Sequence, residues 1–368
     1  MDFTISREHF LERANIAAAV VERKQTLPIL ANVLLVVDSA GSSLTGTDLD
    51  TEISIDIEVD QVREGGEITL PGRKLVDILK ALPQDALIEC RLDGSHIVLK
   101  SGRSRFKLAT LAAADFPRVE MQGDTTAVAV PAAPLSRAVS KVQFAMAQQD
   151  VRYYLNGMHL SVAEGRLRCV ATDGHRLALS DVTIEDTAAT ASLILPRKAV
   201  LELAKLLSGA GEKPVALRFS SSHLQVEIAG LSFTSVLIEG RFPDYERVMP
   251  KGRQNTLGVD RKLFKEVLGR AAILSNEQFR GVRMVLDDGA LTVATQNTEQ
   301  EEAEETIEAV FDGASSYEIG FNVGYLQDVL GVIENDQVEF QLGDPNGSAL
   351  MVGKGDMQSQ YVVMPMRL

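Results

Sequence analysis

The sequence predicts an α+β protein built from three copies of one domain. Three observations lead to this prediction: a hairpin with Asp or Asn at its tight turn occurs three times, an amphipathic helical pattern precedes each hairpin, and a strand running into a second helix follows each one. The 368 residues are enough for two or three domains that each bury a core.

The hairpin is clearest in LRCVATDGHRLALS, from Leu167 to Ser180. An apolar run ends in Thr172-Asp173-Gly174, and an alternating run follows, which is typical of two strands joined by a tight Asp-Gly turn. The pattern occurs again as LTGTDLDTEIS from Leu44 and as LTVATQNTEQEEA from Leu291. Its turn residues, Asp48, Asp173 and Asn297, lie roughly 125 residues apart, which is a domain spacing and not that of a solenoid.

The flanking elements repeat in the same order. Apolar residues at spacings of three and four predict a helix before each hairpin, at Arg7 to Lys24, Leu135 to Ala147, and Arg261 to Leu274. Strands that run into a second helix follow, as ITLPGRKLVDILKAL from Ile68, LILPRKAVLELAKLL from Leu193, and YEIGFNVGYLQDVLGVI from Tyr317. Each copy closes with alternating strands, such as HIVLKSGRSRFKLATL from His96. The predicted domains are 1–122, 127–249 and 254–368; three unrelated antiparallel domains are the alternative, which the matched order of elements disfavours.

Bulk composition narrows the class of protein. Cys90 and Cys169 are the only cysteines, so neither a disulfide framework nor a zinc spacing is present. The first residues, MDFTISREHF, lack the apolar core of a signal peptide, and no apolar run is long enough to cross a bilayer. We therefore expect a cytoplasmic protein with no membrane association.

The net charge of −14 argues at first against binding to nucleic acid, but the charge is unevenly distributed. Five of the six helical windows are net positive, whereas the strands and loops collect the acidic residues. Helices that share one surface would attract phosphates without reading bases. The plain alternative is that these charges only solvate the outer faces of helices.

Motifs for catalysis are missing from the sequence. Gly209 to Lys213 lacks the spacing and the Ser/Thr of a phosphate-binding loop, and there is no HExxH, GxSxG or CxxC. Asp173 and His175 could form an acid–base pair, which keeps a hydrolase as an alternative. Because Asp48 and Asn297 occupy the position of Asp173, a turn role is favoured over catalysis. We expect no catalytic residue, metal or cofactor.

Two further stretches suggest binding. AMAQQDVRYYLNGM, from Ala145, combines Gln148, Gln149, Arg152, Tyr153 and Tyr154, whose amide, guanidinium and phenol groups suit phosphate, sugar or stacked bases. The last residues, QYVVMPMRL, are apolar, although chain ends usually fray. Val362, Val363 and Met364 could complete a sheet. The flexible methionines could form a groove for several peptides, or the tail could only cap its own core.

These residues resemble the bacterial DNA polymerase III beta subunit family, the sliding clamps, over the whole length of the chain. The resemblance is carried by TLPIL at Thr26, SLTGTDL at Ser43, SGRSRF at Ser101, QDVRYYLNGM at Gln149, ATDGHRLA at Ala171, GRFPDY at Gly240, AAILSNE at Ala271, FRGVR at Phe279 and the terminal YVVMPMRL. It implies the DNA-clamp fold, in which two three-domain chains join head to tail into a ring with antiparallel sheets outside and helices lining the hole.

The resemblance also implies three sets of site residues. The DNA-binding residues would be Lys24, Arg73, Gln149, Tyr153 and Tyr154; relatives commonly have Arg at the position of Lys24, and Lys keeps the charge but lacks the planar fork. The partner-peptide pocket would comprise Leu155, Thr172, Gly174, His175, Arg176, Leu177, Pro243, Arg247, Val248, Val362, Met364, Pro365 and Met366. The dimer interface would join the basic Lys74, Arg103 and Arg105 to an acidic run, Glu299, Glu301, Glu302, Glu304 and Glu305, around Ile273 and Leu274.

The function that these residues imply is that of a processivity factor without catalysis of its own. It would encircle duplex DNA regardless of sequence and tether DNA polymerase III through its alpha subunit. An ATP-driven clamp loader would place it on DNA through the loader's delta subunit, and other polymerases and repair proteins with a clamp-binding motif would share the pocket. Besides the hydrolase, a scaffold that binds peptides but no DNA is the remaining alternative.

Overall fold

The computed structural model describes residues 1–21, 27–121, 123–185, 189–211, 213–250, 255–287, 289–313 and 316–367. The chain divides into two compact units. The first comprises Met1–Ala133 and Leu201–Leu237, and the second comprises Pro134–Val200 and Ile238–Leu368. No helix among the described residues is long and apolar enough to span a membrane. The domain boundaries expected from the sequence remain a prediction.

The described part of the first unit contains two antiparallel sheets. One has the strand order β5-β1-β7-β8-β9, and the other has the order β10-β15-β16-β17-β4-β3-β2-β6. The strands of the first sheet are β1 (Asp2–Ser6), β5 (Gln61–Glu64), β7 (Leu87–Asp93), β8 (His96–Ser101) and β9 (Ser104–Ala109). Those of the second are β2 (Asn32–Val37), β3 (Ser42–Thr47), β4 (Thr51–Ile57), β6 (Gly66–Pro71), β10 (Thr126–Pro131), β15 (Pro214–Phe219), β16 (His223–Ile228) and β17 (Leu231–Val236).

Two more antiparallel sheets form the described part of the second unit, with the orders β14-β11-β12-β13-β26-β25-β24-β18-β22 and β21-β20-β19-β23. The strands of the first are β11 (Gly157–Ala163), β12 (Arg166–Thr172), β13 (Arg176–Thr183), β14 (Ala191–Pro196), β18 (Asn255–Asp260), β22 (Val310–Asp312), β24 (Gln337–Leu342), β25 (Ala349–Gly353) and β26 (Ser359–Val363). Those of the second are β19 (Gly281–Asp287), β20 (Ala290–Gln296), β21 (Glu302–Glu308) and β23 (Ser316–Asn322).

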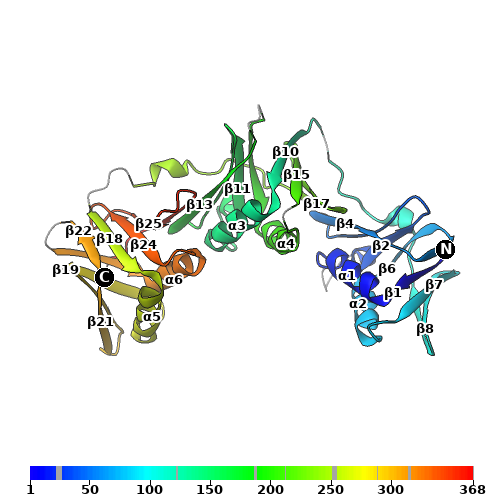
Figure 1. Ribbon diagram of the computed structural model, residues 1–368, viewed down its shortest axis with the longest axis horizontal. Helices are drawn as coiled ribbons and strands as arrows, with labels where there is room; N and C mark the ends of the chain where they lie inside the picture. The colour runs from blue at the N-terminus through cyan, green and yellow to red at the C-terminus, as the bar shows by residue number, and fades with distance from the viewer. Residues whose placement is uncertain are drawn as a thin grey trace. The chain divides into compact units, whose positions relative to one another are not determined.

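Each unit has a pair of helices that lie side by side, as Figure 1 shows. Helices α1 (Arg7–Ala17) and α2 (Gly72–Ala81) belong to the first unit, and α5 (Arg261–Ala271) and α6 (Val323–Val332) belong to the second. Helices α3 (Ala132–Val142) and α4 (Arg197–Ser208) cross the division between the units. Short 3₁₀ turns lie at Pro28–Ala31, Ala113–Asp115, Gln143–Ala145, Tyr153–Leu155, Tyr245–Arg247 and Ala272–Leu274.

Side-chain hydrogen bonds to the backbone cap the helix ends, and the same kinds of cap recur along the chain. Asp260 accepts a hydrogen bond from the backbone N–H of Leu263 and caps α5, while Asn322 does the same for α6. At the other end, the Arg7 guanidinium donates to the Leu79 and Lys80 carbonyls near the end of α2. The Arg261 guanidinium donates to the Leu330 carbonyl of α6 and to the Asn335 carbonyl just beyond that helix. In each unit, the arginine that begins one helix of the pair therefore caps the end of the other helix.

The repeated order of elements predicted from the sequence is confirmed. All three hairpins are antiparallel pairs, β3 with β4, β12 with β13, and β20 with β21. Strands β6, β14 and β23 each run directly into a helix. The three predicted helical windows correspond to α1, α3 and α5, although all three are too long, because α1 ends at Ala17, α3 at Val142 and α5 at Ala271.

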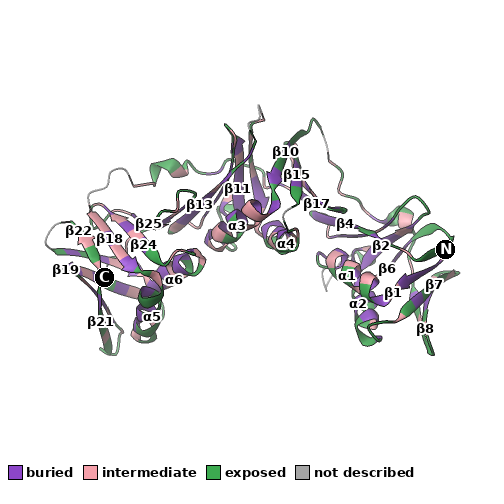
Figure 2. Cartoon of the chain, in the orientation of Figure 1, coloured by how far each residue is buried: buried purple, intermediate pink, exposed green. Residues whose placement is uncertain are grey.

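Burial follows the predicted periodicity in several elements (Figure 2), whereas strands such as β2 are buried on both faces. Helix α5 buries Phe264, Val267, Leu268 and Ala271, at the spacings of three and four that one helical face requires. Strands such as β24 alternate buried with partly exposed residues. In such elements, the spacing of the apolar residues determines which face packs into the core.

Candidate functional site

The turn between β12 and β13 is held by side chains that cap its own backbone. The Asp173 carboxylate accepts hydrogen bonds from the backbone N–H groups of His175 (2.9 Å) and Arg176 (3.0 Å). The Thr172 hydroxyl donates to the Arg176 carbonyl at 2.7 Å and accepts from the Gly174 N–H at 3.1 Å. This is an Asx turn, in which an aspartate replaces part of the backbone ladder.

The other two hairpins use the same device. Asp48 accepts from the N–H groups of Asp50 and Thr51, and the Asn297 side chain accepts from those of Glu299 and Glu301. The side chain at the position of Asp173 therefore holds the turn in all three copies, as the repeat predicted. The backbone N–H of His175 donates to the Asp173 carboxylate, whereas the His175 ring stacks on the Tyr325 ring, with ring centres 6.1 Å apart. The geometry of a catalytic acid–base pair is not formed at these two residues.

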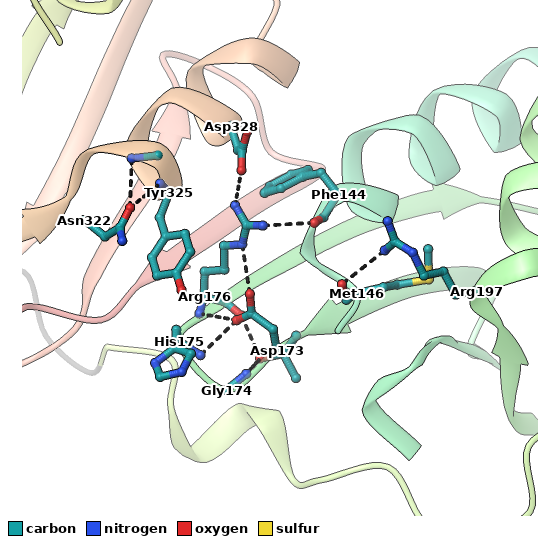
Figure 3. A network of polar contacts seen from close by, with 12 residues as sticks. Phe144, Met146, Asp173, Gly174, His175, Arg176, Arg197, Asn322, Tyr325 and Asp328 are labelled. Carbon is teal, nitrogen blue, oxygen red and sulfur yellow. Dashed lines mark hydrogen bonds and ion pairs between the residues drawn. The ribbon is translucent and has the colours of Figure 1, made fainter. Parts of the chain in front are cut away.

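Arg176 connects this turn to the helix α6 (Figure 3). Its Nε donates to the Asp173 carboxylate at 3.1 Å, its Nη2 donates to the Phe144 carbonyl at 3.2 Å, and its Nη1 pairs with Asp328. The guanidinium also lies 5.1 Å from the Phe144 ring centre and 4.7 Å from that of Tyr325. A planar guanidinium can make all of these contacts at once, whereas an ammonium cannot.

A cavity of about 160 Å³ opens beside this network in the second unit. Its floor is formed by Leu155, Leu177 and Val362, each no more than 2% exposed. Val248 and Met364 line it as well and are each 37% exposed, so they leave apolar surface open to a ligand. Its full lining is Arg152, Tyr154, Leu155, Thr172, Gly174, Arg176, Leu177, Pro243, Tyr245, Val248, Val362 and Met364. An apolar hollow with a few polar groups on its walls is suited to an apolar anchor of a ligand.

The sequence predicted nine of these lining residues and missed three. Arg152, Tyr154 and Tyr245 were not assigned to the pocket, although Tyr154 directly precedes Leu155 in the chain and Arg152 lies three residues before it. The Arg152 guanidinium donates to the Asp150 carboxylate and holds the pKa of that carboxyl at about 2, below its ordinary value. Nη2 of Arg152 also reaches the Asp173 carbonyl at 3.2 Å, so this arginine is fixed at the edge of the cavity.

Four predicted pocket residues lie outside the lining of this cavity. His175 and Arg247 are exposed beside it, and Arg247 forms an ion pair with Asp244. Pro365 and Met366 line a second hollow of about 340 Å³, together with Gly320 and Arg283. The terminal chain reaches that hollow because the N–H of Met364 donates to the His175 carbonyl and the N–H of Met366 donates to the Gly320 carbonyl. The tail thus completes a sheet up to Val363, as predicted, and then passes along two hollows.

The residues predicted to contact DNA are placed in different surroundings. Lys24 lies outside the described residues. Arg73 is exposed on α2 and donates to the Val21 carbonyl at 2.7 Å. Gln149 is exposed, and Tyr153 is 57% exposed. Tyr154, by contrast, is half-buried in the cavity wall and meets the Tyr153 ring edge-on, 5.7 Å away.

Most of the predicted dimer residues are exposed, whereas Leu274 and Glu305 are half-buried. Lys74 lies on α2, and Arg103 and Arg105 lie at the hairpin of β8 and β9. Ile273 is 77% exposed and Leu274 is half-buried. Of the acidic run, Glu299, Glu302 and Glu304 are exposed, while Glu301 accepts from the Asn297 side chain and Glu305 pairs with Arg270 of the same chain.

Among the residues that the structure describes, no group of three His, Cys, Asp or Glu side chains could hold a metal ion. Both cysteines are buried, which raises the pKa of each thiol. A buried thiol of raised pKa is a poor nucleophile.

Three family models cover almost all of the chain. The N-terminal, central and C-terminal domains of the DNA polymerase III beta subunit match residues 1–120, 129–244 and 246–367. Curated relatives named beta sliding clamp include those of Pseudomonas putida, at 49% identity, and Escherichia coli, at 43%, and each comparison covers 100% of both chains.

Solved structures agree with these relatives. A crystal structure of the sliding clamp of Pseudomonas aeruginosa bound to griselimycin is 48% identical, with a TM-score of 0.97 over 100% of both chains. That of the polymerase III beta subunit of Caulobacter crescentus is 38% identical, with a TM-score of 0.93 over the same share. The repeated hairpins and helices, the family models and the full-length relatives lead to one conclusion: this chain belongs to the DNA polymerase III beta subunit family, the beta sliding clamps of DNA replication.

Proposed function

We propose that two copies of this chain close head to tail into a ring around duplex DNA and tether DNA polymerase III to it. The observation that carries the tethering role is the cavity of about 160 Å³, whose apolar floor is sealed by buried residues while Met364 and Val248 remain exposed at its edge. A partner peptide would place an apolar side chain on this floor, and Arg152 and Arg176 would fix its orientation.

The same cavity accounts for several partners. Methionine is flexible and polarizable, so Met364 can adapt to different anchors. The alpha subunit of the polymerase, the delta subunit of the clamp loader, and other polymerases and repair proteins with a clamp-binding motif would then bind one at a time. The loader would supply the nucleotide, and this chain would do no catalysis of its own.

This chain would contact the sugar–phosphate backbone of DNA and not the edges of the bases. Lys24, Arg73, Gln149 and Tyr153 offer a cation, a guanidinium, an amide and a phenol, all of which suit phosphate or sugar. A ring that slides cannot hold sequence-specific hydrogen bonds, so the affinity would be independent of sequence and would fall with salt. Tyr154, which lines the cavity, is the member of the predicted set that is least available for this role.

Deletion of Met364 to Leu368 tests the tethering role. The deletion removes the exposed anchor but leaves strand β26 and the proposed dimer contact in place. We expect a dimer of near-normal melting temperature that neither stimulates the polymerase on primed circular DNA nor is loaded. Met357→Ala is the matched control, because Met357 is 88% exposed and lies outside the cavity lining.

Two outcomes would contradict the assignment. A truncated protein that unfolds or becomes monomeric would make the tail chiefly structural. A truncated protein that folds and still supports processive synthesis would place the partner site elsewhere.

A further inference from the structure

A third cavity, separate from the two hollows described above, shares one wall with the proposed peptide pocket. It measures about 310 Å³ and is lined by His159, Ser192, Ile194 and residues 240–246. Pro243 and Tyr245 line both this cavity and the peptide pocket, so they form a wall with a hollow on each side. The wall borders open space on both sides, so its position depends on side-chain contacts, among them the packing of Tyr245 against the buried cluster of Phe242, Leu177 and Val362.

The segment 240–249 that carries this wall has no strand to hold it. The backbone hydrogen bonds that the described residues show within it, Arg247 to Asp244 and Val248 to Tyr245, join the segment only to itself. Pro243, Tyr245 and Val248 of this segment all line the peptide pocket. Side-chain contacts must therefore place these three residues relative to the sheet.

His159 makes one set of those contacts, and Arg168 of β12 makes another by donating to the Tyr245 hydroxyl at 3.4 Å. His159 lies on β11, which pairs with β12 on one side and β14 on the other and is therefore a fixed base. Its ring stacks on Phe242, with ring centres 4.9 Å apart and planes 13° from parallel, and lies 6.2 Å from the ring of Tyr245. His159 and Phe242 are each 8% exposed. The stack holds the residue that immediately precedes Pro243.

The polar atoms of His159 are arranged for a neutral ring. Nε2 lies 2.9 Å from the Ser192 hydroxyl, whereas Nδ1 is buried and has no hydrogen-bond partner. A neutral imidazole with its proton on Nε2 donates to Ser192 and leaves only an acceptor unpaired, which is less costly than an unpaired donor. Burial keeps the ring uncharged at neutral pH, because it lowers the pKa of His159 to about 4.

We propose that His159 is a positioning residue for the peptide pocket: by stacking on Phe242 it sets the wall of Pro243 and Tyr245 against which a partner peptide packs. This inference rests on the proposed function of the pocket, but it also predicts a property of the free protein. Without the stack, the segment 240–249 should open more often, since nothing but side chains holds it to β11.

Two variants at this site separate the aromatic stack from the hydrogen bond. His159→Leu fills the position with an aliphatic side chain and removes both the stack and the bond to Ser192, while His159→Phe keeps an aromatic ring for the stack and loses only the bond. His223→Leu is the matched control, because its ring also lies beside a serine hydroxyl, Ser222 at 2.8 Å, but belongs to strand β16 of the other unit.

The first readout is hydrogen exchange of the free protein, which needs no partner. We expect faster exchange of the Arg247 and Val248 amides in His159→Leu than in the unmodified protein, with His159→Phe and His223→Leu unchanged. Equal protection in all four proteins would overturn the inference.

The second readout is the affinity for a fluorescently labelled peptide that carries the clamp-binding motif of the polymerase alpha subunit. We expect His159→Leu to bind it about threefold to tenfold more weakly, the factor that corresponds to one lost aromatic pair, and His159→Phe to bind normally. If His159→Phe is as weak as His159→Leu, or if neither differs from the unmodified protein, His159 does not position the wall. If the unmodified protein fails to bind the peptide, the assignment of the pocket is wrong, and the exchange experiment alone decides the role of His159.

Discussion

Arg176 on strand β13 pairs with Asp328 on helix α6, 152 residues further along the chain. The same guanidinium donates to Asp173 in its own turn and to the carbonyl of Phe144. One side chain therefore ties the β12–β13 hairpin to a helix in a distant part of the sequence, and it does so at the edge of the peptide pocket.

Replacement of Arg176 should destabilise the protein. Arg176→Met removes charge-assisted hydrogen bonds to Asp173 and to a backbone carbonyl, and it removes the cation from between two rings. We expect a loss of about 2 kcal/mol in the free energy of unfolding, measured by urea titration. Arg247→Met is the control, because the Arg247–Asp244 pair is exposed and should contribute less than about 0.5 kcal/mol. Equal effects of the two variants would show that the Arg176 network does not stabilise the fold.

The repeated turn allows a paired test of backbone strain. Gly174 has φ +90°, and Leu49, in the corresponding turn of the first unit, has φ +82°. Gly174→Ala should lower the free energy of unfolding by about 1 kcal/mol, because a side chain disfavours this conformation and its Cβ would lie 3.0 Å from the Arg152 guanidinium. Leu49→Gly should be neutral or stabilising for the same reason. Thermal midpoints of the two variants check this, and a destabilised Leu49→Gly protein would contradict it.

The proposed dimer should depend on a small apolar contact. Ile273→Ala combined with Leu274→Ala should yield monomers at low micromolar concentration, because central apolar burial contributes more than exposed ion pairs do. Light scattering coupled to gel filtration measures the mass. Val310→Ala is the control, since Val310 is 76% exposed and is not among the predicted interface residues. A double variant that stays dimeric would refute this interface.

Stability should fall as the pH is lowered below neutrality because of His159. The pKa of this ring is lowered to about 4 in the folded protein from an ordinary value near 6.5, so between these values the unfolded chain binds more protons. Folding is therefore favoured at pH 7.5 relative to pH 5.5, by about 1 kcal/mol from this group. The titratable residues Arg241, Asp244, Tyr245 and Glu246 line the cavity next to the ring, and the cause of the lowered pKa of His159 is its burial.

His159→Phe isolates the contribution of the histidine to this pH dependence. The variant cannot titrate at this position, so its unfolding free energy, measured by urea titration at both pH values, should fall less between pH 7.5 and 5.5. A pH dependence identical to that of the unmodified protein would show that His159 is not buried in a neutral state.

The parts that could be predicted from the sequence are those with local causes. The Asx turns were predictable because Asp173 caps N–H groups only two and three residues away, and the helix α5 because its apolar spacing is regular. The stack of His159 on Phe242 could not be predicted, since the two residues are distant in sequence and no local pattern relates one to the other. Tyr153 and Tyr154 are neighbours with different surroundings, one exposed and one in the cavity wall, and only tertiary packing separates them.

Retention on circular DNA tests the central claim, that two copies of this chain encircle duplex DNA without reading its sequence. The protein would be loaded on a nicked circular plasmid with its clamp loader and ATP, separated from free protein by gel filtration, and then treated with a restriction enzyme that cuts the plasmid once. We predict that the protein stays with the circle and is lost when the DNA is linearised, because a ring without specific contacts slides off an end. Protein that remains bound to the linear DNA, or that is never retained on the circle, would contradict the account.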